Sequence, residues 1–198
     1  MIEKAGTVVV IGGGPSLTPE QVEMCRGRAR VVAVKEAAQL APWADAMYFC
    51  DEHWFRKHEN EVKNFKGMKA TLAHPALLAE VPGLVSYRND GELGLCEAPD
   101  GLRHGHNSGY QAINFAFHLK ARLIVLLGMD MNKKDGRMHW FDRKVCQPIE
   151  MYQSVMLPCF KTLIEPLAAH GVRVVNATPG SAIDCFPKMA LEEALCIA

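Results

Sequence analysis

Short, almost wholly apolar runs recur along the chain, separated by longer stretches that mix apolar and polar residues. A run without polar alternation is typical of a strand that is buried on both faces, as in a parallel sheet. The most apolar run, Leu123–Leu127, is predicted to lie at the centre of the sheet. The other predicted strands are Thr7–Ile11, 31–34, 46–50, 69–73, 84–87 and 172–175.

The stretches between these runs predict helices. Thr18 is a good N-cap, Pro19 suits the first helical position and Gln21 completes a capping box, so a helix should follow the first strand. Further helices are predicted at 51–64, at 108–120, at 149–170 with an interruption near Pro158, and at Leu191–Cys196. This alternation predicts an α/β, Rossmann-like fold: a mostly parallel sheet with helices on both faces and a ligand site at the carboxyl ends of the strands.

Length and composition fit a single domain that spans 1–198. Lys plus Arg and Asp plus Glu number 22 each, so the chain lacks the basic surplus of a general nucleic-acid binder. No apolar run reaches the roughly 18 residues of a membrane span, and no secretory leader precedes the first strand. We therefore expect a cytoplasmic protein without membrane contact, whose seven cysteines are reduced thiols. The oligomeric state stays open, with a homo-oligomer among the options.

A glycine-rich turn joins the first predicted strand to the capped helix. Gly12, Gly13 and Gly14 are followed by Pro15 and Ser16. Glycines allow a backbone to approach a ligand closely, and the first turn of such sheets often holds phosphate. The turn matches neither GxGxxG nor a Walker A motif, which disfavours a conventional dinucleotide or P-loop site. These five residues are predicted nucleotide contacts; a tight turn without a ligand is the alternative.

A second polar cluster precedes the predicted helix at 108–120. His104 and His106 are followed by Asn107, Ser108 and Gly109, and an arginine stands just before them. Two histidines, an arginine and glycines that arrive together are typical of an anion or sugar site. His106, Asn107, Ser108 and Gly109 are predicted nucleotide contacts. The alternative is that these residues only cap the helix.

Four further segments contribute candidate residues. Asp130 follows the most apolar strand, where open sheets bind ligands, and is a catalytic candidate. In the loop after it, Arg137 is a candidate for a phosphate and His139 for a general base or acid. Lys35 and Asp51 end the second and third predicted strands, at the same sheet edge as the glycine turn, and are predicted nucleotide contacts. A loop cap at Asp130 and a solvated loop after it are the alternatives.

Several segments, in their order along the chain, resemble a family of Rossmann-like proteins of phages and prophages whose function is largely uncharacterised. The segments are GGGPSL, KEA, APWAD, YFCD, NSGYQAINFA, LLGMDM, GRMHW and VVNATPGSAIDCFP. More distantly, the GPSL turn, the helix that begins with SG and the strand that ends in GMD resemble two enzyme groups. These are the bacterial CMP-sialic-acid-dependent sialyltransferases and the archaeal-type 6-hydroxymethylpterin diphosphokinases.

The resemblance implies a nucleotide at the carboxyl edge of the sheet. In the sialyltransferases, the GPSL turn and the SG segment contact the nucleotide, and a histidine of a later loop is the base. Carried over, these roles make His139 the candidate base of this chain. Gly13 and Lys35 stand where the sialyltransferases usually have asparagine. The nucleotide contacts implied by the resemblance are Gly12, Gly14, Pro15, Ser16, Ser108 and Gly109.

Three hypotheses about function follow. The first is a transferase that uses a nucleotide-activated donor, most simply a nucleotide sugar. The second is pyrophosphoryl transfer from ATP to a small alcohol, which needs Mg²⁺ with Asp51 and Asp130 as candidate ligands. The third is a non-catalytic phage accessory protein that binds a nucleotide or nothing.

Overall fold

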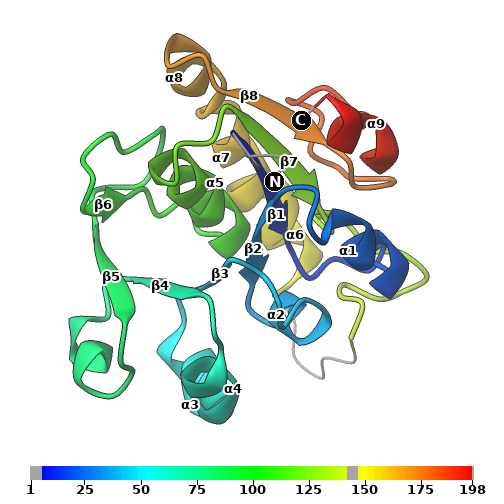
Figure 1. Cartoon of the computed structure of the whole chain (residues 1–198). Helices are drawn as coiled ribbons and strands as arrows, with labels where there is room; N and C mark the ends of the chain where they lie inside the picture. Colours follow the sequence, from blue (N-terminus) through cyan, green and yellow to red (C-terminus); the bar gives the residue numbers. More distant parts are fainter. Residues whose placement is uncertain (1–5, 142–146, 198) are drawn as a thin grey trace.

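The computed structural model describes residues 6–141 and 147–197 (Figure 1). The strands in this part of the chain are β1 (Thr7–Ile11), β2 (Arg30–Val34), β3 (Ala46–Phe49), β4 (Met68–Leu72), β5 (Leu84–Asn89), β6 (Gly101–Leu102), β7 (Leu123–Leu127) and β8 (Arg173–Asn176). They form one parallel sheet in the order β6-β5-β4-β3-β2-β1-β7-β8. The predicted Rossmann-like α/β arrangement is thereby confirmed.

Helices cover both faces of this sheet. They are α1 (Pro19–Cys25), α2 (Ala37–Leu40), α3 (Glu52–Lys57), α4 (Glu59–Asn64), α5 (Ser108–His118), α6 (Ile149–Met151), α7 (Leu157–Lys161), α8 (Ile164–Ala169) and α9 (Leu191–Cys196). Alternate residues of a strand point to opposite faces, and β1 shows the consequence. Val8 and Val10 belong to one buried cluster, which includes α5 and α7, whereas Val9 and Ile11 belong to another, which includes α1 and α9.

The chain reverses its direction across the sheet next to β1. From β1 it proceeds strand by strand to β6, then returns through α5 to β7 on the other side of β1. The loops that follow the neighbouring strands β1 and β7 therefore lead to opposite sides of the sheet, one toward β2 and the other toward β8. Open parallel sheets bind ligands at such a switch point.

Some details differ from the sequence-based predictions. β7 lies next to the edge strand β8 rather than at the centre, because burial on both faces requires only flanking strands and covering helices. The helix predicted at 51–64 is two helices that meet at His58. The interruption predicted near Pro158 is confirmed: a π-helical turn, Tyr152–Met156, lies directly before α7, where proline cannot donate a helical hydrogen bond.

Among the helices of residues 6–141 and 147–197, none is long and apolar enough to cross a membrane.

Candidate functional site

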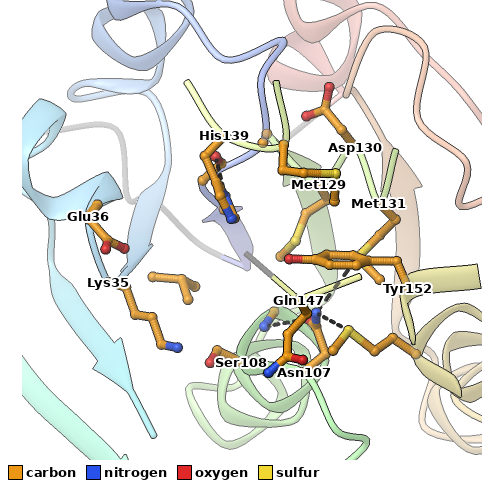
Figure 2. A pocket seen from close by; sticks show the side chains of 18 of the residues that line it. Lys35, Glu36, Asn107, Ser108, Met129, Asp130, Met131, His139, Gln147 and Tyr152 are labelled. Atoms are coloured by element: carbon orange, nitrogen blue, oxygen red, sulfur yellow. Dashed lines mark hydrogen bonds between the residues drawn. The ribbon is translucent and has the colours of Figure 1, made fainter. Parts of the chain in front are cut away.

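A cavity of about 410 Å³ opens at the carboxyl ends of β1, β2, β3 and β7, beside the start of α5 (Figure 2). It brings together most of the residues that the sequence singles out. Pro15 and Ser16 lie outside its lining because they are buried behind the glycine turn, and Arg137 is exposed on the far part of its loop. The predicted residues that line the cavity are Gly12, Gly13, Gly14, Lys35, Asp51, His106, Asn107, Ser108, Gly109, Asp130 and His139.

The glycine turn packs closely against the loop that follows β7. The amide of Gly12 donates to the carbonyl of Leu127, and that of Gly14 to the carbonyl of Gly128, both at 2.8 Å. A Cβ atom at Gly12 would lie 2.6 Å from the Gly128 oxygen, and one at Gly14 would lie 1.9 Å from Oδ2 of Asp130. These two glycines are therefore needed for contact between two loops, and their amides are used within the fold.

Gly13 is the glycine against which the loop at 138–141 closes. Its carbonyl accepts hydrogen bonds from the amide of Trp140 at 3.2 Å and from Nδ1 of His139 at 3.1 Å. The His139 ring stacks on Phe141, with centroids 5.0 Å apart, and reaches into the cavity (Figure 2). Because a carbonyl only accepts, Nδ1 carries the proton, so in the neutral ring Nε2 holds the lone pair.

Asp130 lines the cavity with its backbone side but turns its carboxylate away from the centre (Figure 2). Its Oδ1 accepts from the amide of Ser16 at 3.0 Å, and its backbone carbonyl accepts from the amide of Ala182 at 2.8 Å. Burial raises the pKa of this carboxyl above its ordinary value, and hydrogen bonding to Ser16 opposes the shift only in part. In this conformation Asp130 links the two loops beneath the cavity.

The raised pKa of Asp130 predicts a pH-dependent stability. The folded protein binds this proton more tightly than the unfolded chain, so the carboxyl stabilises most below its unfolded pKa of about 3.8, and the contribution is lost as pH rises through the folded value. The side-chain amide of an Asp130→Asn variant would accept from Ser16 without ionising. We therefore expect the unfolding free energy of the wild type, relative to that variant, to fall between pH ~3.5 and pH ~7 in urea titrations.

The control for this experiment is Asp184→Asn, because the Asp184 side chain is 83% exposed. Its difference from the wild type should stay flat over the same pH range. A flat difference for Asp130→Asn as well would show that burial does not penalise the Asp130 charge.

The residues after β8 hold the loop that carries Asp130. The hydroxyl of Thr178 accepts from the amide of Met129 at 3.0 Å, and the hydroxyl of Ser181 donates to the Met129 carbonyl at 2.7 Å. Both side chains are buried. Thr178 and Ser181 therefore hold the backbone of Met129 in the loop after β7, and they do not line the cavity.

Lys35 and Asp51 form an ion pair on the β2–β3 side of the cavity. Lys35 has a φ of 54°, a left-handed conformation that is uncommon for a residue with a side chain, and its amide donates to the Tyr48 carbonyl at 2.9 Å. This backbone turn ends β2 and leaves the Lys35 side chain along the cavity, as Figure 2 shows.

The start of α5 forms the floor of the cavity. Oδ1 of Asn107 accepts from the amides of Gly109 at 2.8 Å and Tyr110 at 3.1 Å, so Asn107 is the N-cap.

The Ser108 hydroxyl lies 3.1 Å from Sγ of Cys50. Burial raises the pKa of the Cys50 thiol, and the nearby Lys35 opposes this shift to a smaller extent. From the sequence, Cys50 has no role beyond that of a reduced thiol, yet it lines the cavity.

The opposite wall is rich in sulfur and was not foreseen from the sequence. Tyr152 of the π-helical turn lies on this wall (Figure 2), and Nδ2 of Asn107 contacts Sδ of Met131 at 3.7 Å and Sδ of Met156 at 3.6 Å. Unbranched thioethers adapt to the shape of a bound ring and pack well against aromatic groups. The wall consists of Met129, Met131, Met156 and Tyr152, and the apolar lining is completed by Met138 and by Phe141, which stacks on His139.

The described residues contain no group of three or more His, Cys, Asp or Glu side chains arranged to hold a metal ion. Asp51 pairs with Lys35, and the Asp130 carboxylate faces Ser16, so these two candidate magnesium ligands do not converge in this conformation.

Comparisons with protein-family models, with curated proteins and with solved structures found no match to this chain.

Proposed function

We propose that the cavity binds a nucleotide-type ligand and that the protein is a transferase that uses a nucleotide-activated sugar. The observation that carries the proposal is the convergence, at the β1–β7 switch point, of a cation, a helix start and an oriented histidine. Lys35, Ser108 and His139 all line this one cavity. Its volume of about 410 Å³ lies within the range of small-molecule sites.

The polar residues of the cavity suit the phosphate of a nucleotide, and its apolar residues suit the base. Lys35 and the positive end of α5 favour a phosphate. The wall of methionines with Tyr152, together with Phe141 beside His139, favours a flat ring. The glycine turn takes a smaller part than the sequence suggests, because the amides of Gly12, Gly14 and Ser16 are bonded within the fold.

His139 supports sugar transfer rather than binding alone. Nδ1 is held by the Gly13 carbonyl, so Nε2 of the neutral ring carries the lone pair; this atom is buried in the present conformation and would accept the proton of an acceptor hydroxyl once ligand binding exposes it. The freed oxygen would form a bond to the anomeric carbon of the donor. The bond from that carbon to the phosphate oxygen would break, and its electron pair would leave with the phosphate, facing Lys35.

Thermal unfolding with CMP, CDP, UDP, GDP, ATP and nucleotide sugars, each with and without Mg²⁺, tests the proposal. A ligand at a hundredfold excess over its Kd stabilises the folded state by about 2.7 kcal/mol, a rise in Tm of roughly 5–10 °C for a chain of this length. We expect a cytidine nucleotide to give this rise without metal. Lys35→Met should diminish it, whereas Lys57→Met, on the exposed side of α3, should not.

A rise with ATP that requires Mg²⁺ would contradict sugar transfer and favour pyrophosphoryl transfer. No rise with any ligand would favour an accessory protein.

A further inference from the structure

We infer that His104 is a second functional histidine of this cavity, a hydrogen-bond donor that contacts an anionic oxygen of the ligand through Nε2–H. The inference rests on the proposed function, since it assumes a ligand that carries phosphate. Of the two histidines before α5, the sequence favours His106 as the contact. The hydrogen bonds within the loop assign the two residues different roles.

The first step is the tautomer of His104. Its Nδ1 lies 3.2 Å from the backbone amide of His106, and an amide only donates. Nδ1 must therefore be unprotonated, so the proton of the neutral ring is on Nε2. Within the described residues, Nε2 of His104 makes no hydrogen bond, and the residue lines the cavity. Among the residues that the structure describes, this N–H group has no acceptor.

The ring of His106 is already bonded to another side chain. Its Nε2 lies 2.8 Å from Oε1 of Glu92, on the exposed rim. Its ring meets the His104 ring edge-on, with centroids 4.7 Å apart, and so buttresses it. Burial, and secondarily the neighbouring His106, lower the pKa of His104, whereas Glu92 opposes the shift. The lowered pKa makes His104 a neutral hydrogen-bond donor at pH 7. A neutral N–H group can bind an anionic oxygen of the ligand by a hydrogen bond rather than by an ion pair.

The backbone of His104 is anchored from the core. Its carbonyl accepts from Nε2 of Gln111 at 2.6 Å, and Oε1 of Gln111 accepts from the buried Tyr48 hydroxyl at 3.0 Å. The loop then turns through Gly105 at φ 50° and His106 at φ 53°. A Cβ at Gly105 would lie 2.0 Å from the Tyr110 ring, so the turn is tightly defined. A strained turn held by buried hydrogen bonds pre-organises the His104 donor.

His104 and His139, which both line the cavity, thus have opposite tautomers. His139 donates from Nδ1 to the Gly13 carbonyl, whereas His104 accepts at Nδ1 from the His106 amide. In the neutral rings, Nε2 of His139 carries a lone pair but is buried in the present conformation, whereas Nε2 of His104 carries a proton. A site that removes a proton from an acceptor and stabilises a leaving phosphate needs both groups.

Two measurements test the inference. In the ligand-free protein, ring ¹⁵N chemical shifts should show the Nε2–H tautomer for His104. In titrations with inorganic pyrophosphate, His104→Ala should bind about tenfold more weakly or worse, as expected when a hydrogen bond to a charged group is lost. His104→Gln, whose amide can place a donor near Nε2, should stay within about threefold of the wild type. The control is His53→Ala, on the exposed side of α3.

An Nδ1–H tautomer at His104, wild-type affinity of His104→Ala for pyrophosphate, or no pyrophosphate binding to the wild type would overturn the inference. The proposed function fails separately, in the nucleotide panel. A metal-independent cytidine response that His104→Ala leaves unchanged would refute the role of His104 and keep the proposed function.

Discussion

Gly14→Ala is expected to lower the free energy of unfolding by about 3 kcal/mol, the upper end of the range for overpacked interiors. The new Cβ would lie 1.9 Å from Oδ2 of Asp130 and 2.7 Å from the Gly128 carbonyl oxygen. The first atom ends a short, buried side chain that a hydrogen bond holds in place, and the second belongs to the backbone. Asp130 is held by the Ser16 amide, and Gly128 is backbone next to β7. Urea denaturation of the wild type and the variant measures the loss.

The clash can be separated from a general effect of alanine by a double-mutant cycle. Asp130→Ala removes the carboxylate that meets the new Cβ and leaves the contact with Gly128. Gly14→Ala should therefore cost less in the Asp130→Ala background, with a coupling of at least about 1 kcal/mol. Additive effects would show that Asp130 does not make Gly14 necessary.

The main elements of the fold were predictable because their signals are local. β1, β7 and α9 begin and end at the residues predicted from the pattern of apolar and polar positions. The capping box of Thr18 and Gln21 starts α1 as expected. The place of β7 beside β8 was not predictable, because strand order depends on where each crossover returns, and no local pattern records that.

The edge of the sheet that carries the cavity was predictable in the same way, since the carboxyl ends of parallel strands meet at one edge. The direction of each side chain was not. Asp130 and His139 follow the same strand, yet one carboxylate turns toward Ser16 and the other side chain enters the cavity. His104 and His106 both line the cavity, yet only the ring of His106 is bonded to Glu92, and the sequence does not record this difference. The methionine wall gave no signal, since methionine is equally common in cores.

His139→Ala should reduce kcat for sugar transfer by a factor of about 10²–10⁴, the usual contribution of a general base. The nucleotide should bind within about threefold of the wild type, because the phosphate and ring contacts assigned above come from other residues. The measurement pairs steady-state kinetics with the donor identified in the thermal panel and calorimetric Kd values for its nucleotide.

His139→Gln distinguishes a role of His139 in proton transfer from a role in holding the Gly13 carbonyl. The glutamine amide can still donate to the Gly13 carbonyl, which His139 Nδ1 meets at 3.1 Å, but it has no basic nitrogen. If Nε2 is the base, glutamine and alanine should lose turnover alike, and only glutamine should keep the wild-type Tm. If glutamine restores turnover, His139 acts by holding the glycine turn against its loop, and the base must be another group. If the glutamine and alanine variants lose turnover equally and have the same Tm, the hydrogen bond to Gly13 does not contribute to stability. Proton transfer is then the reason for a histidine at this position.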